Sequence, residues 1–233
     1  MTQLLHSLTF ALALAAALPA TAPAATEATA PSAQSLLFDA EYLRPLPAPS
    51  RIAYDYVVKT ANEQRFGKAF NDEVALRLAP AADGNGEKDV FVDMFTGDRQ
   101  RVIGPLARVA GNPIIMMFLE RDVSQMNMHI GGQPVYFRNV IRMAFREKAK
   151  LEPASFQWDG RQVNGTKVTI QPFMGDPNGE RMQFFRTKTY EFIVSDAVPG
   201  GIYQMHSTIA DDSQPAPAAP AIDITMTLKG VAQ

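Results

Sequence analysis

Methionine and histidine side chains gather between Asn112 and His129, and thioether sulfur and imidazole are ligands that suit Cu(I). Met126 and His129 are three residues apart and would share one face of a helix, whereas Met128 would point about 200° away from Met126. A thioether site needs about three or four soft ligands, and this spacing aligns two. The pattern therefore favours methionines that fill a core or line a groove for an apolar ligand, and we expect no metal and no cofactor.

A basic stripe follows, with Arg138, Arg142, Arg146 and Lys150 at strict four-residue intervals. Residues four apart share a helix face, so these cations repel one another unless something pairs with them. A ligand carrying phosphate or carboxylate would relieve that repulsion, because the arginine fork suits such groups. The alternative is a solvated face balanced by acidic residues elsewhere, such as Asp93, Asp98 or Glu120, and the sequence leaves both interpretations open.

Residues for nucleophilic catalysis are sparse, because the three histidines stand apart at positions 6, 129 and 206. Ser195 and Asp196, with His206 further on, provide the residue types of a catalytic triad, but nearness in sequence does not establish triad geometry. No G-x-S-x-G, HExxH, P-loop or G-x-G-x-x-G motif is present. We therefore assign no catalytic residue, and the sequence favours a binding protein over an enzyme.

The overall charge argues against nucleic acid as a partner. Lys and Arg total 22 and Asp and Glu total 24, which gives a formal charge of −2 and no field that attracts polyanions. The chain contains no cysteine, so disulfide bonds, thiolate chemistry and lipid attachment at a lipobox cysteine are excluded.

The N-terminus resembles a signal peptide. An apolar run extends from Leu8 to Leu18, Pro19 ends it, and small residues follow with a cleavage signal at Ala24, so residues 1–24 are expected to be removed. An uncleaved membrane anchor is the alternative, but it needs about 20 continuous apolar residues, more than this run provides.

Export and the lack of cysteine together favour a periplasmic location, or a secreted one. Residues 25–37, rich in Ala, Thr and Pro, are expected to form a flexible N-terminus. Residues 38–233 are long enough for one domain with a substantial core.

Strand patterns occupy the first half of that domain. Apolar and aromatic residues alternate with polar ones over 51–60 and 73–80. After a strong turn signal at residues 83–86, the stretch 88–106 predicts a third strand and, beyond a turn at 96–98, a fourth. These three or four strands are expected to form an antiparallel meander.

A helical hairpin is predicted over about 112–150. Asn112 is a preferred N-cap residue and Pro113 suits the first helical position, so a helix should begin there and end at Gly131. Its expected apolar stripe contains Met116, Leu119, Val123, Met126 and Ile130, with the Glu-Arg-Asp triplet at 120–122 mostly in solvent. A second helix from Pro134 to about Pro153 would bury Phe137, Ile141, Ala144 and Phe145.

Strands resume after the hairpin, with turn signals at Asp159-Gly160 and at Asn164-Gly165. Two further strands flank a turn at 198–201, a Pro/Ala loop covers 211–220, and a last alternating strand covers 222–230. The predicted fold class is α+β, with a mainly antiparallel sheet and the hairpin packed on it.

This order of strands, helical hairpin and strands is similar to that of periplasmic lipoprotein-carrier (LolA/LolB-like) half-barrels, in which a curved antiparallel sheet surrounds helices. The segments NPIIMMFLERDVSQM, YFRNVIRMAF and KTYEFIVSDAVPGGIY also resemble those of uncharacterised exported proteins of Gram-negative bacteria. The resemblance covers about residues 38–230 and implies an apolar cavity between sheet and helices that accepts acyl chains. The N-terminal helix often found in such carriers is not apparent here.

Three functions are compatible with these features: a non-enzymatic carrier of an amphipathic, lipid-like ligand, a cell-envelope assembly factor that binds a protein partner, and a periplasmic hydrolase. The first agrees best with the hairpin, whose cations would lie near an anionic head group or a membrane surface. The expected ligand-binding residues are Met116, Phe118, Leu119, Met126, Phe137, Ile141, Arg138, Arg142 and Arg146.

Overall fold

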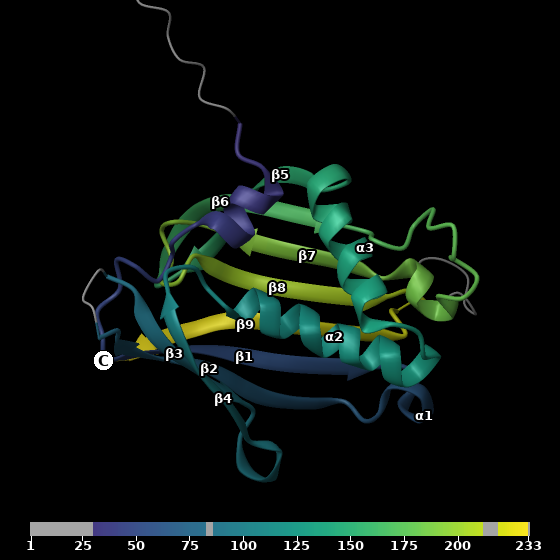
Figure 1. Ribbon diagram of the computed structural model, residues 1–233, viewed down its shortest axis with the longest axis horizontal. Coiled ribbons are helices and arrows are strands. Elements are labelled where there is room, and N and C mark those ends of the chain that lie inside the picture. The colour runs from purple at the N-terminus through teal and green to yellow at the C-terminus, as the bar shows by residue number, and fades with distance from the viewer. Residues whose placement is uncertain (1–29, 83–85, 212–218, 233) are drawn as a thin grey trace, which may run out of the picture. The chain divides into compact units, whose positions relative to one another are not determined.

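In the described part of the chain, nine strands form one open, curved antiparallel sheet in the computed structural model (Figure 1). The structure describes residues 30–82, 86–211 and 219–232. The predicted signal peptide lies outside the described residues, as does most of the predicted Pro/Ala loop. Residues 31–233 form one compact unit.

The strands pair in the order β4-β3-β2-β1-β9-β8-β7-β6-β5, and each neighbouring pair is antiparallel. Their bounds are β1 (Ser50–Thr60), β2 (Phe70–Pro80), β3 (Lys88–Met94), β4 (Arg101–Val109), β5 (Lys150–Trp158), β6 (Arg161–Ile170), β7 (Thr189–Val194), β8 (Ile202–Ile209) and β9 (Ile222–Ala232). The helical segments are η1 (Ser35–Asp39), α1 (Glu63–Phe66), η2 (Gly97–Arg99), α2 (Ile114–Ile130), α3 (Pro134–Glu147) and η3 (Gln183–Thr187).

The hairpin of α2 and α3 crosses the sheet because of this strand order. It connects β4 to β5, and these two strands form the opposite edges of the sheet. The connection must therefore pass over one face, and Figure 1 shows both helices in front of the central strands. The first and last strands, β1 and β9, pair at the centre of the sheet, which ties the two halves of the chain together.

The core lies between the hairpin and the inner face of the sheet. Alternate residues of the strands point to this face, as period-two patterning requires. Phe118 of α2 and Phe145 of α3 both pack against the ring of Phe192, with ring centroids 6.4 and 5.5 Å apart. The fully or nearly fully buried strand residues include Ile52, Tyr54, Tyr56, Val74, Leu76, Val90, Val92, Val168, Ile170, Tyr190, Phe192, Met205, Met226 and Leu228.

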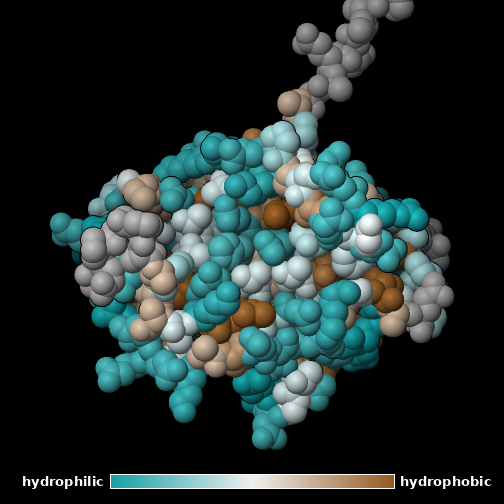
Figure 2. Space-filling view, turned by 180° about the vertical axis from the view of Figure 1, so that it is seen from behind, coloured by the Kyte–Doolittle hydropathy of each residue, from teal (hydrophilic) through white to brown (hydrophobic). Residues whose placement is uncertain are grey.

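The outer face of the sheet is mostly hydrophilic when viewed from the side opposite the helices (Figure 2). Its charged side chains pair across neighbouring strands. The ion pairs are Arg51 with Glu73, Arg77 with Asp93, Lys229 with Asp55 and Glu73, and Lys167 with Glu152 and Glu191.

The predicted fold class is confirmed, a curved antiparallel sheet with an inserted helical hairpin. The start of the hairpin lies one residue later than predicted, since α2 begins at Ile114 with Pro113 at its N-cap position, but Asn112 still binds the first turn of the helix. The Asn112 side chain accepts a hydrogen bond from the Ile114 N–H at 3.1 Å, and its amide nitrogen donates to the Tyr54 hydroxyl and the Gly200 carbonyl at 3.1 and 2.7 Å. One buried amide thus caps α2 and joins it to β1 and to the β7–β8 turn.

Two local predictions were wrong. Asn164 and Gly165 lie inside β6 and form no turn. A Cβ at Gly165 would stand 2.3 Å from the Val194 carbonyl oxygen, so this glycine allows close approach of two strands. Helix α3 ends at Glu147, before the predicted end at Pro153, which belongs to β5. Proline is tolerated there because β5 is an edge strand.

The N-terminal part of the unit includes residues that the sequence assigned to a flexible segment. A helical segment covers residues 33–39, and Ala33 and Leu37 within it are buried, with 2% and 3% of their surfaces exposed. Packing therefore begins several residues before the predicted domain boundary at residue 38. This short helix, of which η1 is the greater part, supplies one wall of the candidate site.

Candidate functional site

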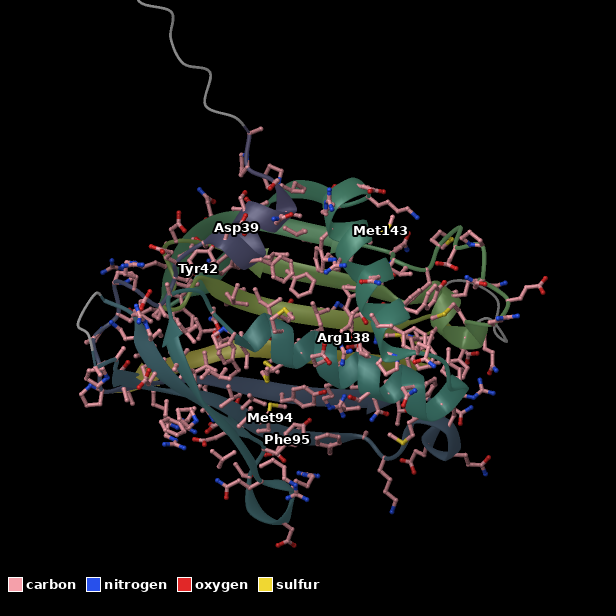
Figure 3. The ribbon with its side chains drawn as sticks, viewed as in Figure 1. Asp39, Tyr42, Met94, Phe95, Arg138 and Met143 are labelled. Carbon is pink, nitrogen blue, oxygen red and sulfur yellow. The ribbon has the colours of Figure 1, made fainter. Side chains whose placement is uncertain are left out.

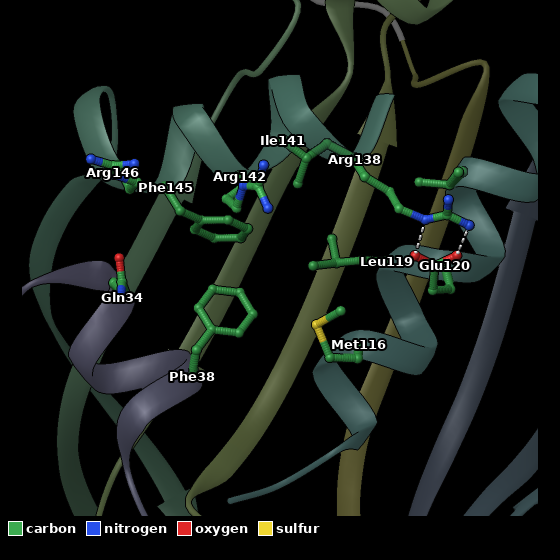
Figure 4. Close-up of a pocket in the computed structure, with 11 residues that line it drawn as sticks. Gln34, Phe38, Met116, Leu119, Glu120, Arg138, Ile141, Arg142, Phe145 and Arg146 are labelled. Carbon is green, nitrogen blue, oxygen red and sulfur yellow. Dashed lines mark hydrogen bonds and ion pairs between the residues drawn. The ribbon is translucent and has the colours of Figure 1, made fainter. Parts of the chain in front are cut away.

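A groove of about 680 Å³ lies between α2, α3 and the helical segment that contains η1 (Figure 4). It is the candidate ligand site, because it combines an apolar floor with charged groups along one side. The residues that line it are Gln34, Phe38, Met116, Leu119, Glu120, Val123, Arg138, Ile141, Arg142, Phe145 and Arg146.

The floor consists of aliphatic, thioether and aromatic side chains from all three segments. Phe38 packs edge to face against Phe145, with their ring centroids 5.1 Å apart, so the short helix is fixed against α3. Phe38 and Met116 nevertheless keep 36% and 45% of their surfaces exposed. Apolar surface of this kind is left in contact with solvent when nothing occupies the groove.

At one end of the charged side of the groove, the positive charge of an arginine is neutralised by a neighbouring carboxylate. The Arg138 guanidinium donates to both carboxylate oxygens of Glu120, at 2.6 and 2.8 Å, which links α3 to α2. This hydrogen-bonded pairing and the charge of Glu120 raise the pKa of Arg138.

The other end of the charged side lacks such compensation. Arg142 donates to the neutral Asn139 side chain at 2.7 Å, and neither Arg142 nor Arg146 has a carboxylate partner among the residues that the structure describes. Figure 4 shows Arg146 and Gln34 at the end of the groove opposite the Arg138–Glu120 pair. An anion would therefore find uncompensated positive charge at this end.

The nine predicted site residues divide between the groove and the core. Six of them line the groove: Met116, Leu119, Ile141, Arg138, Arg142 and Arg146. Phe118, Met126 and Phe137 are buried in the core with at most 3% of their surfaces exposed, and none of the three lines the groove. Phe118 packs against Phe192 of β7, and Phe137 packs against Phe173 in the segment that follows β6.

Five residues that line the groove were not among the predicted site residues: Gln34, Phe38, Glu120, Val123 and Phe145. Val123 and Phe145 were expected on the buried faces of the two helices. Gln34 and Phe38 come from a segment more than 70 residues before the hairpin, and no short-range pattern connects the two. The sequence offered Glu120 as one of the acidic residues that could balance the basic stripe, and its pairing with Arg138 agrees with that, although its triplet was expected mostly in solvent.

Asp122, the last residue of that triplet, corrects the prediction that the triplet lies mostly in solvent. It is 4% exposed, and its Oδ2 lies 2.6 Å from the Lys188 ammonium, which itself donates to the Ser207 hydroxyl at 3.0 Å. A buried charge needs a close opposite charge and further hydrogen bonds, and Lys188 and Ser207 provide both for Asp122. The ion pair therefore holds α2 against the inner face of the sheet.

Ser207 and Lys188 have the residue types of a Ser–Lys catalytic pair, but their environment does not suit one. The Lys188 ammonium lies 2.6 Å from Asp122 Oδ2 and is 2% exposed, so a substrate cannot reach it. A general base must be within reach of the reacting group.

The sequence also offered Ser195, Asp196 and His206 as a possible triad, and the structure does not join them. His206 lies on the outer sheet face with its ring nitrogens 3.2 Å from Glu191 and 3.1 Å from Asp223. The Ser195 hydroxyl instead donates to the Asn164 carbonyl at 2.7 Å. This pairing therefore supports no hydrolase mechanism.

The methionines of α2 are also not arranged as metal ligands. Met126 is fully buried and Met128 is 68% exposed, while the His129 ring packs among Phe66, Phe184 and Phe185. Across the described ranges there is no group of three or more His, Cys, Asp or Glu residues placed to hold a metal ion. Within the same ranges, no helix has the length and apolar character needed to span a membrane.

The chain shows distant similarity to proteins of known structure. No family model matches the chain, and a search of curated proteins finds no match. Among solved structures, the Mycobacterium tuberculosis lipoprotein LppX matches with a TM-score of 0.31 and 10% identity, covering 77% of this chain and 84% of LppX. A LolA superfamily protein from Nitrosomonas europaea matches with a TM-score of 0.22 and 9% identity, covering 87% of this chain and 93% of that protein.

Proposed function

We propose that this protein is an exported, non-enzymatic carrier that holds an amphipathic ligand in the groove between α2, α3 and the η1 segment. One observation supports the proposal. The groove combines an exposed apolar floor with two arginines at one end, Arg142 and Arg146, that have no carboxylate partner among the described residues. We further propose that residues 1–24 direct export and are then removed, and that the mature chain functions in the periplasm.

The size and chemistry of the groove suit a lipid-like molecule. Its volume of about 680 Å³ falls in the range of about 300 to 1,000 Å³ that is common for small-molecule sites. Phe38, Met116 and Leu119 would cover the apolar part of the ligand, and methionine adapts readily to chains of irregular shape.

The anionic head group would bind at the Arg142 and Arg146 end. Arg138 is already held by Glu120 in two hydrogen bonds, so it has less capacity for a second anion. Arg142 and Arg146 are one helical turn apart and can both reach one phosphate or carboxylate. We therefore expect the ligand to lie along α3 with its head beside Arg146.

Binding of a fluorescent fatty acid tests the proposal, together with native mass spectrometry and lipid extraction of the purified protein. Met116→Glu places a carboxylate on the apolar floor and should weaken binding at least about ten-fold, because a charge is costly beside apolar groups. Met128→Glu is the matched control, since Met128 is exposed on the same helix and does not line the groove.

Each result has a definite consequence. Loss of binding in Met116→Glu and retention in Met128→Glu would support the groove as the site. Equal binding by both variants, or no bound lipid and no probe binding by the wild-type protein, would refute the proposal.

A further inference from the structure

The outward side of α3 carries a second arrangement of charge and apolar surface. Val135, Asn139, Arg142, Met143 and Arg146 recur at three- and four-residue steps and share this side, which we call the α3 crest. Val135 and Met143 are 56% and 52% exposed and do not line the groove. Figure 3 shows Met143 and Arg138 along α3 on the helix-bearing side of the molecule.

The crest differs from an ordinary solvated helix face in its charge balance. Arginines on the outer sheet face have carboxylate partners, for example Arg51 with Glu73 and Arg77 with Asp93. Arg142 and Arg146 have none among the residues that the structure describes, and they stand four positions apart, where like charges repel. A negatively charged surface next to the crest would remove this repulsion.

The exposed apolar residues of the crest are single side chains: Met143 stands between Arg142 and Arg146, and Val135 lies about two turns before Arg142. A protein interface usually has an apolar core that is depleted of charge, and the crest has no such core. Lone apolar side chains among arginines are instead typical of helices that lie in the head-group region of a bilayer. The long arginine side chains can reach lipid phosphates while Val135 and Met143 enter the upper acyl region.

We propose that the α3 crest docks on the surface of an anionic lipid bilayer. Phe38 and Met116, the exposed apolar residues of the groove, lie on the segments that face α3, so docking would bring the groove mouth close to the lipid. The inference extends the proposed carrier function, but docking itself does not require that the groove hold a ligand.

Docking of this kind is weak, reversible and sensitive to salt. Each arginine close to an anionic surface contributes about five-fold to the partition coefficient, so Arg142 and Arg146 together contribute roughly 25-fold. The attraction falls off within about 10 Å at ordinary ionic strength, and added salt should release the protein.

Site-specific labelling tests the orientation of the docked protein. The chain has no cysteine, so Met143→Cys and Lys59→Cys each allow one environment-sensitive fluorophore to be attached at a single position. Lys59 is exposed on β1, outside the crest and the groove, and is the control position. With vesicles of phosphatidylcholine and phosphatidylglycerol, the label at 143 should shift to the blue, and the label at 59 should not.

Co-sedimentation tests the role of charge. The double variant Arg142→Gln/Arg146→Gln should lower the partition coefficient on the same vesicles by roughly 25-fold. Arg51→Gln/Arg77→Gln removes the same net charge from the outer sheet face and should change it by less than about three-fold. Vesicles of phosphatidylcholine alone should bind neither the wild-type protein nor either variant.

The inference is overturned if the wild-type protein fails to bind the anionic vesicles, if both labels shift equally, or if both double variants bind equally weakly. Recovery of a stable protein partner through the crest, without vesicle binding, would also overturn it in favour of a protein interface. Fatty-acid binding in solution is measured without vesicles, so a failure of docking is separable from a failure of the carrier function.

Discussion

The outer face of the sheet and the side that carries the helices differ in how far their charges are compensated. On the outer face, carboxylates and cations pair across the strands, and the His206 ring lies between two carboxylates. On the helix side, one buried ion pair fastens α2, and two arginines on the rim of the groove have no carboxylate partner within the described ranges.

This difference indicates that the outer face of the sheet is a scaffold and that the helix side is a binding surface, which we call the working surface. A face whose charges are already compensated gains little from an external partner, whereas uncompensated cations beside exposed apolar groups gain from an amphipathic one. Beneath that working surface, polar groups are few and buried, so each of them should matter more to stability than its counterpart on the outer face. The following predictions test that comparison.

Alkaline pH should have the largest effect, because it acts on several buried groups beneath the helices at once. Burial raises the pKa of Tyr54 and of Tyr190, in the second case with help from the charge of Asp122, and burial followed by the charge of Asp196 raises the pKa of Tyr42 to about 12. A raised folded-state pKa gives stability that is complete below the unfolded value near 10 and is lost as the pH rises through the folded value. Unfolding should therefore accompany phenolate formation above about pH 10.

Circular dichroism and phenolate absorbance recorded on the same samples measure this effect. If all six tyrosines ionised near pH 10 while the far-UV signal remained unchanged, the phenols would be accessible in the folded protein. That result would contradict the buried positions of Tyr54 and Tyr190.

Removal of one partner of the buried ion pair should be the most damaging single substitution. Lys188→Ala leaves Asp122 as a buried, unpaired charge, and we expect a loss of about 3 to 5 kcal/mol in the free energy of unfolding. Urea denaturation measures the loss. The double variant Asp122→Leu/Lys188→Met, which leaves no charge, should recover most of it, and a double variant as unstable as the single one would argue against this explanation.

Removal of the buried Asn112 amide should have an intermediate effect. Asn112→Ala leaves the Tyr54 hydroxyl and the Gly200 carbonyl without their donor and α2 without its cap, at a cost of about 1 to 3 kcal/mol. Gln204→Ala is the outer-face control, since that amide donates only to the Thr227 hydroxyl and should cost less than about 1 kcal/mol. If the two variants lost equal free energy of unfolding in chemical denaturation, the predicted difference between the two faces would be wrong.

Disruption of an ion pair on the outer face should have the smallest effect. Arg77 donates to both Asp93 oxygens at 2.7 and 2.9 Å, yet its side chain is 46% exposed. Arg77→Gln should therefore lower stability by less than about 1 kcal/mol, and a double-mutant cycle with Asp93→Asn at low and high salt gives the coupling energy. A coupling as large as the loss in Lys188→Ala would show that the outer face is not merely a solvated scaffold.

The sequence by itself determined the fold class, the two long helices and most of the strands, because their signals are local. Period-two alternation marks the strands, Asn112 and Gly131 bound α2, and four-residue spacing places Arg138, Arg142 and Arg146 on one side of α3. These patterns depend on backbone geometry within a few residues, which is why they can be read without knowledge of the rest of the chain.

The tertiary structure alone decided which of these residues form a site. Asp122 is buried because Lys188 and Ser207, more than 60 residues away in sequence, approach it across the sheet. The η1 segment brings Phe38 to Phe145, and the crossing from one sheet edge to the other sets α2 beside α3 with a groove between them. Such contacts join distant parts of the chain, so only the packing of the whole unit determines them.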